Sequence, residues 1–291
     1  MPISNRYRGP AHLAADVETA LQTLNEQLDV TAEETATHTV LNVDGFGEGD
    51  TLEATAVYLV GAVAASIEEN MNVRKALYDE ADVERDLLAD IVSIIRGNNQ
   101  IDETFRATSR DAWVWEGISH LLVHLSRHDP AFHPSGTVLV KTSVKHDVKD
   151  HGLDLIGLYR GSSIGVSAGE SKAYLNDPAR GIRDASNRLQ EVDLNKRDTE
   201  LRSTVNQLRP SLPAGDQDEL AGAFWRNERT YLPFVCCDLT HAEDWKSDRP
   251  TLTRLKVAAS KKLLVPLSIT AARDTFDSIC SLMREYPSHT A

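Results

Sequence analysis

The chain has 291 residues, of which 41% are apolar, so it is long enough to bury a sizeable hydrophobic core. Its formal net charge of −13 at pH 7 argues against a protein that is basic overall and binds nucleic acid through that charge. The acidity is concentrated in the N-terminal part: residues 1–120 contain 8 Lys and Arg against 22 Asp and Glu, whereas residues 141–210 contain 12 against 10. A local basic groove is therefore still possible in the C-terminal part.

The first hundred residues are predicted to be mainly helical. Apolar residues recur at spacings of three and four over residues 11–28. The longest apolar run, residues 54–67, is shorter than the roughly 18 residues that a membrane span needs, so it indicates a buried helix. The N-terminus has the features of neither a signal peptide nor a transit peptide, and we expect a cytoplasmic protein without a membrane partner.

A glycine-rich turn precedes that buried helix. Asp50 and Glu53 have the spacing of a reciprocal helix cap, in which two side chains satisfy free amides at the helix start. Together with Asp44 and Glu48 they could instead form a calcium loop, but their spacing does not match the regular loop of alternating ligands. We therefore predict a capped helix start.

The pattern changes after residues 97–100 (GNNQ), where we place a domain boundary. The following elements are expected: a helix over 111–128, a strand within 137–146, two strands within 151–175 joined by a Gly-Ser-Ser turn, one or two charged helices over 178–208, strands over 231–239 and 262–270, and a closing helix over 271–286. The predicted fold is α/β, with a mixed central sheet flanked by helices in a domain of residues 101–291. A mainly helical acidic domain of residues 1–100 precedes it.

The three cysteines have no metal-ligand spacing, and two of them are adjacent within an apolar strand-like run. Buried thiols are more common in such a run than a redox or metal site. We therefore expect Cys236, Cys237 and Cys280 to be buried and free.

The two strands within residues 151–175 carry acids where apolar residues are expected. Strand alternation places Asp154 on one face with apolar neighbours, and it places Glu170 on the same face as Lys172. A hairpin would bring Asp154 close to Glu170, and two carboxylates repel each other unless a proton or a cation lies between them. Mg²⁺ is the natural hard cation for such a pair, so the sequence predicts a magnesium site here.

That site would have a specific chemistry. A metal on Asp154 and Glu170 can polarise a phosphodiester and lower the pKa of a bound water, while Lys172 orients the water or neutralises charge on phosphorus. An isolated Glu-x-Lys triplet is more often a solvated pair on a strand face. Its context, with an acid on the preceding helix and a basic helix after it, favours a site that hydrolyses the phosphodiester bonds of a nucleic-acid strand.

The arrangement over about residues 109–240 resembles the PD-(D/E)xK nuclease superfamily, whose core is a helix, three strands, a helix and a further strand. The resemblance implies a restriction-endonuclease-like core in which Asp154 and Glu170 bind the metal and Lys172 is the lysine of the triplet. It also implies that Glu116, on the preceding helix, is an additional metal-binding acid. Leu153 replaces the proline of the family name.

Residues 115–134, 145–160 and 169–175 are more narrowly similar to the nuclease subunits (HamA) of the Hachiman anti-phage defence system. This similarity implies a Mg²⁺-dependent DNA endonuclease, with Mn²⁺ able to substitute, that works beside a helicase. Gln190 would correspond to a glutamine that some superfamily members place near the DNA or the metal. The acidic N-terminal region would suit a docking surface for a basic partner, although a merely solvated helical domain explains it equally well. A catalytically silent adaptor that binds a helicase or another partner is the alternative.

Histidines provide a competing interpretation. One helix carries a stripe at every fourth position, with two further histidines in reserve, and together these residues could bind zinc: Glu116, His120, His124, His128, His146 and His151. The HExxH motif is absent, and one helix can bring only two successive members of the stripe to one ion. We therefore expect satisfied or surface histidines. His151 is the exception, because it lies just before Asp154 and could contact a substrate phosphate.

Overall fold

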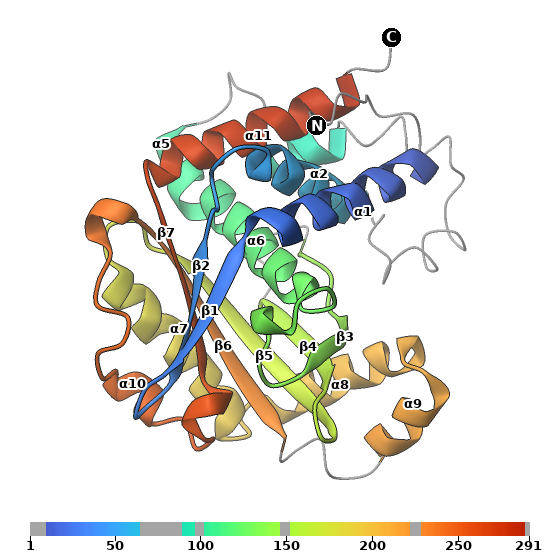
Figure 1. Ribbon diagram of the computed structural model, residues 1–291, viewed down its shortest axis with the longest axis vertical. Coiled ribbons are helices and arrows are strands. Elements are labelled where there is room, and N and C mark those ends of the chain that lie inside the picture. The colour runs from blue at the N-terminus through green and yellow to red at the C-terminus, as the bar shows by residue number, and fades with distance from the viewer. Residues whose placement is uncertain (1–9, 65–88, 97–101, 146–151, 222–227, 289–291) are drawn as a thin grey trace.

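A seven-stranded mixed sheet runs through the centre of the molecule, with strand order β1-β2-β7-β6-β5-β4-β3 (Figure 1). The structure is a computed structural model that describes residues 10–64, 89–96, 102–145, 152–221 and 228–288. The strands are β1 Asp29–Glu34, β2 Thr39–Asp44, β3 Thr137–Lys141, β4 Leu155–Arg160, β5 Ile164–Ala173, β6 Arg229–Asp238 and β7 Leu263–Ile269. The four neighbours β2, β7, β6 and β5 are mutually parallel, whereas β1, β4 and β3 join by antiparallel pairing. The α/β class and the mixed sheet are thus confirmed.

Helices cover both faces of the sheet. The longer ones are α1 Pro10–Gln27, α2 Thr51–Val63, α6 Asp111–Leu125, α7 Pro178–Asp193, α8 Asp198–Leu208, α9 Ala214–Ala221 and α11 Ala272–Ser288, and the shorter ones are α5 Glu103–Phe105 and α10 Pro250–Thr253. In Figure 1, α6 crosses the face of the sheet nearer the viewer and α7 lies behind the sheet. The charged stretch after the Glu-x-Lys triplet therefore forms two helices, α7 and α8. The stretch that follows α8 contains α9.

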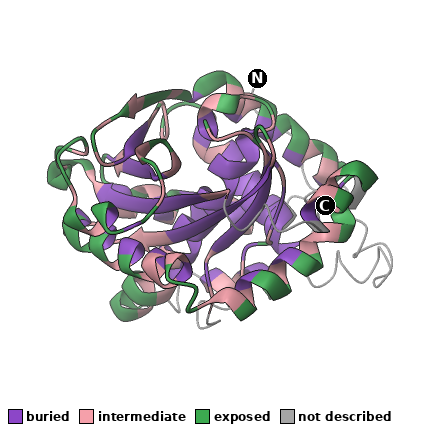
Figure 2. Cartoon of the chain, turned by 90° about the horizontal axis from the view of Figure 1, so that it is seen from below, coloured by how far each residue is buried: buried purple, intermediate pink, exposed green. Residues whose placement is uncertain are grey.

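The sheet separates two hydrophobic clusters. Apolar residues of α1, α2, α6 and α11 pack against one face, and those of α7, α8 and α10 pack against the other. Figure 2 shows the strands buried between the layers, while the outer sides of the helices are exposed. Strand β6 is buried along almost its whole length, because a central parallel strand is covered on both faces. Its Cys236 and Cys237 are buried and free, as is Cys280, which confirms the prediction for the thiols.

Helix α2 is the buried helix predicted from the long apolar run, and glycines allow its close packing on both sides. A Cβ atom at Gly61 would lie 2.4 Å from Val17 on α1, and one at Gly117 of α6 would lie 2.3 Å from Leu59 on α2. The predicted reciprocal cap is wrong, because the side chain of Asp50 makes no capping hydrogen bond. The turn is instead closed by Thr51, whose hydroxyl accepts from the Gly47 amide at 3.1 Å and donates to the Glu48 carbonyl at 2.6 Å.

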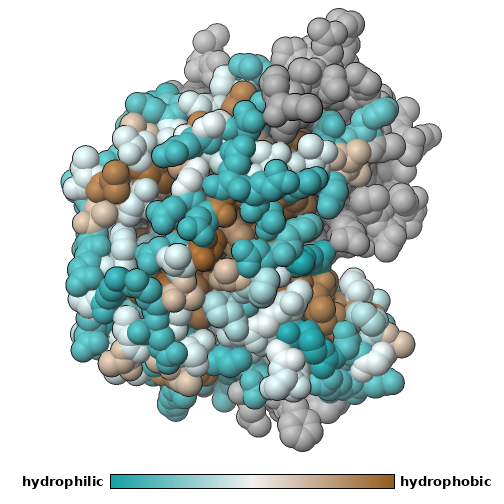
Figure 3. All heavy atoms as spheres, viewed as in Figure 1, coloured by the Kyte–Doolittle hydropathy of each residue, from teal (hydrophilic) through white to brown (hydrophobic). Residues whose placement is uncertain are grey.

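The N-terminal hundred residues also contain a β-hairpin, β1–β2, that the helical prediction missed. Its inner strand β2 pairs with β7, so residues 39–44 extend the sheet formed by the C-terminal part of the chain. The boundary placed at residues 97–100 lies outside the described residues, and the division into domains stays a prediction. Among the described helices, none is long and apolar enough to cross a membrane. The face seen in Figure 3 is mainly hydrophilic, with small hydrophobic areas between polar ones.

Replacing Gly165 with alanine should destabilise the fold. Gly165 pairs with Tyr159 across β4 and β5, and a Cβ atom there would lie 2.3 Å from Tyr159 Cζ. The Tyr159 ring is buried, and its hydroxyl accepts hydrogen bonds from Lys261 at 3.0 Å and Thr230 at 3.1 Å, so it cannot move freely. We expect Gly165→Ala to lower the free energy of unfolding by about 1–3 kcal/mol in urea denaturation.

Gly215 provides the control, since it lies exposed on α9 and a Cβ atom there would meet no heavy atom within 4 Å. Gly215→Ala should leave stability unchanged or raise it slightly, because alanine favours helix. Equal losses for the two variants would contradict the packing argument.

Candidate active site

The β4–β5 hairpin brings the two predicted strand acids together. Its register pairs Leu155 with Gly169, so Asp154, just before β4, lies beside Glu170. The Asp154 carboxylate also accepts a hydrogen bond from the Ser171 amide, at 2.8 Å from Oδ2. The juxtaposition expected from strand alternation is therefore present in the structure.

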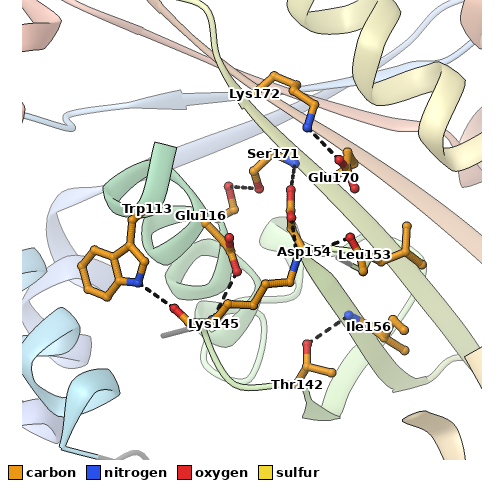
Figure 4. Close-up of polar contacts among 12 residues, drawn as sticks. Trp113, Glu116, Thr142, Lys145, Leu153, Asp154, Ile156, Glu170, Ser171 and Lys172 are labelled. Atoms are coloured by element: carbon orange, nitrogen blue, oxygen red, sulfur yellow. Dashed lines mark hydrogen bonds and ion pairs between the residues drawn. The ribbon is translucent and has the colours of Figure 1, made fainter. Parts of the chain in front are cut away.

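Helix α6 supplies the third acid. Glu116 is buried, and it lies on the other side of Asp154 from Glu170 (Figure 4). Two contacts attach this helix to the hairpin: the Ser171 hydroxyl donates to the Ser119 hydroxyl at 2.9 Å, and His120 Nε2 donates to the Asp154 carbonyl oxygen at 2.8 Å. The polar side of α6 thus holds Asp154 in position, because His120 binds the backbone carbonyl of Asp154.

The three acids interact strongly because two of them are almost fully buried. Burial, followed by the negative charge of Asp154, raises the pKa of Glu116 to about 8. The same two causes, in the same order, raise the pKa of Glu170 to about 7. Each glutamate is only 5% exposed, so solvent screens this repulsion poorly.

Lys172 offsets part of that negative charge. Its Nζ donates to Glu170 Oε1 at 2.7 Å, while Glu170 Oε2 is buried and makes no hydrogen bond to any described residue. Burial disfavours the charged form of Lys172, but the nearby Glu170 and Asp154 outweigh that effect and raise its pKa. Lys172 is therefore an ammonium at neutral pH, in contact with the acid two residues before it.

Lys145 is a further basic residue of the site that the sequence analysis did not identify. Its Nζ donates to Asp154 Oδ1 at 2.9 Å, and its backbone amide donates to Glu116 Oε1 at 3.3 Å. Its carbonyl oxygen accepts from the indole of Trp113 at 2.7 Å, as Figure 4 shows. Lys145 follows β3 in an irregular segment, so no periodicity indicates its position. The available signal was that it lies nine residues before Asp154 in the sequence.

The remaining candidates have different outcomes. Gln190 lies half-buried on α7, but the α7 residue whose charge lowers the pKa of Glu170 is Arg188, two positions earlier. His120 contacts the Asp154 backbone, and His124 packs edge-to-face against Tyr58 with ring centroids 5.9 Å apart. These contacts fit the expectation of satisfied histidines better than a zinc stripe. His146 and His151 lie outside the described residues.

The donor set suits a hard divalent cation. Three carboxyl groups converge, burial and then the charge of Asp154 raise two of their pKa values, and one buried oxygen of Glu170 makes no hydrogen bond to a described residue. Across the described part of the chain, however, no three His, Cys, Asp or Glu side chains are arranged to hold a metal ion together. The ammonium groups of Lys145 and Lys172 instead lie against Asp154 and Glu170. Binding Mg²⁺ would therefore require these side chains to rearrange.

Comparison with known proteins provides no family assignment: no family model matches the chain, and no curated protein matches it significantly.

The raised carboxyl pKa values predict a pH-dependent stability in the presence of EDTA. Between the ordinary value of 4.5 and about 8, the folded protein keeps protons on Glu116 that the unfolded chain releases. Because the folded pKa is the higher one, this contribution to stability is present at low pH and is lost as the pH rises. We expect the free energy of unfolding to fall between about pH 5.5 and pH 8, and to fall by about 1–3 kcal/mol less in Glu116→Gln.

Glu191→Gln is the matched control, since Glu191 is a more exposed glutamate whose hydrogen bond to Arg197 lowers its pKa. This variant should keep the wild-type pH dependence over the same range in chemical denaturation. Two outcomes would contradict the prediction. One is a free energy of unfolding of the wild type that rises between pH 5.5 and pH 8. The other is a fall in Glu116→Gln as large as that of the wild type.

Proposed function

We propose that the protein is a magnesium-dependent DNA endonuclease that hydrolyses phosphodiester bonds. The observation that carries the proposal is the convergence of the buried Glu116 and Glu170 with the partly buried Asp154, beside the Lys172 ammonium. The elements around the site follow the order α6-β3-β4-β5-α7-β6, with α8 and α9 inserted between α7 and β6. Apart from this insertion, the order is the helix, three strands, helix and strand of the PD-(D/E)xK superfamily, which supports a restriction-endonuclease-like core.

Each residue would have a distinct role. Asp154 and Glu170 would hold Mg²⁺, with Glu116 as an additional ligand, and Mn²⁺ would be able to substitute. When bound, the ion would supply Lewis-acid polarisation of the phosphodiester and a more acidic water. Lys172, already ionised beside Glu170, would stabilise the negative charge that develops on the phosphoryl oxygens.

Helix α7 supports DNA as the substrate. It packs beside the triplet: a Cβ atom at Gly181 would lie 3.7 Å from the Lys172 Cβ. Arg180 and Arg183 of the same helix have side chains 54% and 57% exposed, and each lies 3.5 Å from Asp184. Exposed ion pairs of this kind are weak, so these guanidinium groups could exchange Asp184 for a backbone phosphate.

The partner and location follow from the same proposal. A helicase would supply engagement of DNA that this acidic chain, with a net charge of −13, would achieve only weakly alone. The acidic N-terminal region would dock a basic surface of that partner. Three free, buried thiols and a DNA substrate are consistent with action in the cytoplasm.

One observation favours a second candidate, the catalytically silent adaptor. The ammonium of Lys145 lies 2.9 Å from Asp154 Oδ1, where a metal ligand would need a free oxygen. If that contact were permanent, the protein would act by binding a helicase or another partner without cutting DNA. Binding of Mn²⁺ separates the two functions, because a silent adaptor has no need of a metal site.

The cleavage test uses purified protein with plasmid and single-stranded DNA in Mg²⁺, Mn²⁺ or EDTA. We expect metal-dependent cleavage that falls about 100-fold or more in Glu170→Gln and in Lys172→Met, since each removes a charge needed at the reacting phosphate. If the wild type is silent alone, the same comparison should be made after addition of the proposed helicase partner.

Lys246→Met serves as the control for loss of a lysine, because Lys246 is exposed and pairs with Glu33 on β1, across the sheet from the site. This variant should cleave as the wild type does, and circular dichroism should show that all variants are folded. Undiminished cleavage by folded Glu170→Gln would refute the assignment of the site.

A further inference from the structure

Lys145 connects helix α6 with the residues just before β4. It does so through three polar groups: its carbonyl oxygen, its backbone amide and its ammonium. Its carbonyl oxygen and backbone amide contact Trp113 and Glu116 on α6, while its ammonium contacts Asp154 and, at 3.3 Å, the carbonyl of Gly152. The backbone contacts involve atoms that a substitution of the side chain retains. The ammonium contact depends on the side chain alone.

The charge of the site leaves little room for a divalent cation while Lys145 stays in place. Three carboxylates face two ammonium groups, those of Lys145 and Lys172, so the five side chains already carry a net charge close to neutral. Adding two positive charges would make the cluster cationic in a poorly screened environment. If one ammonium moved away, three carboxylates would face one ammonium and the divalent cation, and the net charge of the cluster would again be close to neutral.

Lys145 is the ammonium that is able to withdraw. Its side chain belongs to an irregular segment, and four flexible carbons connect its charge to the backbone. Lys172 is the more exposed of the two, at 26% against 16%, but its backbone is held on β5, where it lies between Glu170 and α7. The Lys145 backbone can keep its contacts with Trp113 and Glu116 while the ammonium moves into solvent.

We propose that Lys145 is a positioning residue that competes with the divalent metal for Asp154, so that metal binding displaces its ammonium and the site stays latent until that exchange occurs. The inference rests on the proposed function, because it assumes that Asp154 and Glu170 are the metal ligands. It assigns to this one lysine the role of an internal counter-ion. A lysine that served only to hold the fold together would not oppose metal binding.

The test is a titration of the full chain with Mn²⁺, followed by electron paramagnetic resonance of the free ion. Lys145→Met removes the competing charge and keeps a side chain of similar length, so we expect the dissociation constant to decrease about tenfold. Lys145→Arg keeps the charge and should bind Mn²⁺ within about twofold of the wild type, as should the remote control Lys246→Met. Unchanged or weaker binding by folded Lys145→Met would overturn the inference.

A second measurement needs no substitution and covers the case in which Lys145→Met fails to fold. In a structure of the wild type with Mn²⁺ bound, the Lys145 ammonium should lie beyond hydrogen-bond distance of Asp154; an intact contact would overturn the inference.

Glu170→Gln distinguishes failure of the inference from failure of the proposed function. If Glu170→Gln loses Mn²⁺ while Lys145→Met gains no affinity, the metal site stands and only the role of Lys145 fails. If no variant binds Mn²⁺, or if Glu170→Gln binds it normally, the proposed site and the inference both fail.

Discussion

Repulsion among the carboxylates of Glu116, Asp154 and Glu170 is the constraint on which the arrangement of the site depends. The pairing of β4 with β5 and the packing of α6 bring these charges together, and neither can be changed without loss of core contacts. The protein offsets the repulsion in three ways: the protonated form of the two glutamates, favoured because burial and the Asp154 charge raise their pKa values; the ammonium groups of Lys145 and Lys172; and the backbone amide of Ser171, which donates to Asp154. Each of these stabilises a cluster that would otherwise oppose folding.

The support around the cluster is mostly neutral and polar. Hydrogen bonds from Ser171 to Ser119, and from His120 to the Asp154 carbonyl, join α6 to the hairpin without adding charge. These contacts hold the acids near one another, whereas the Lys145 ammonium is attached to an irregular segment. Fixed acids beside one counter-ion on an irregular segment form an arrangement in which an added cation would change the behaviour of the site.

Much of the hairpin and its acids was predictable from sequence, because strand alternation and a short turn leave few ways to pair residues 153–173. Lys145 could not be found in this way, since its contacts depend on how an irregular segment crosses α6. The β1–β2 hairpin was missed because β1 is largely exposed and rich in acids, and because β2 becomes part of the sheet only by pairing with β7. Likewise, the cap expected at Asp50 depends on backbone angles that the spacing of acids does not determine.

The pairing of β2 with β7 joins segments more than two hundred residues apart, and it has a consequence for synthesis of the protein. Helix α6 and strands β3 to β5 are encoded by residues 111–173, so the carboxylate cluster can assemble while the ribosome is still extending the chain. The β1–β2 hairpin emerges before the other strands, yet its partner strand β7 is complete only when residues 263–269 have left the ribosome. Its inner edge thus stays unpaired through most of translation, and the acidic side chains of β1 give that nascent hairpin a charge that discourages contact with other emerging chains.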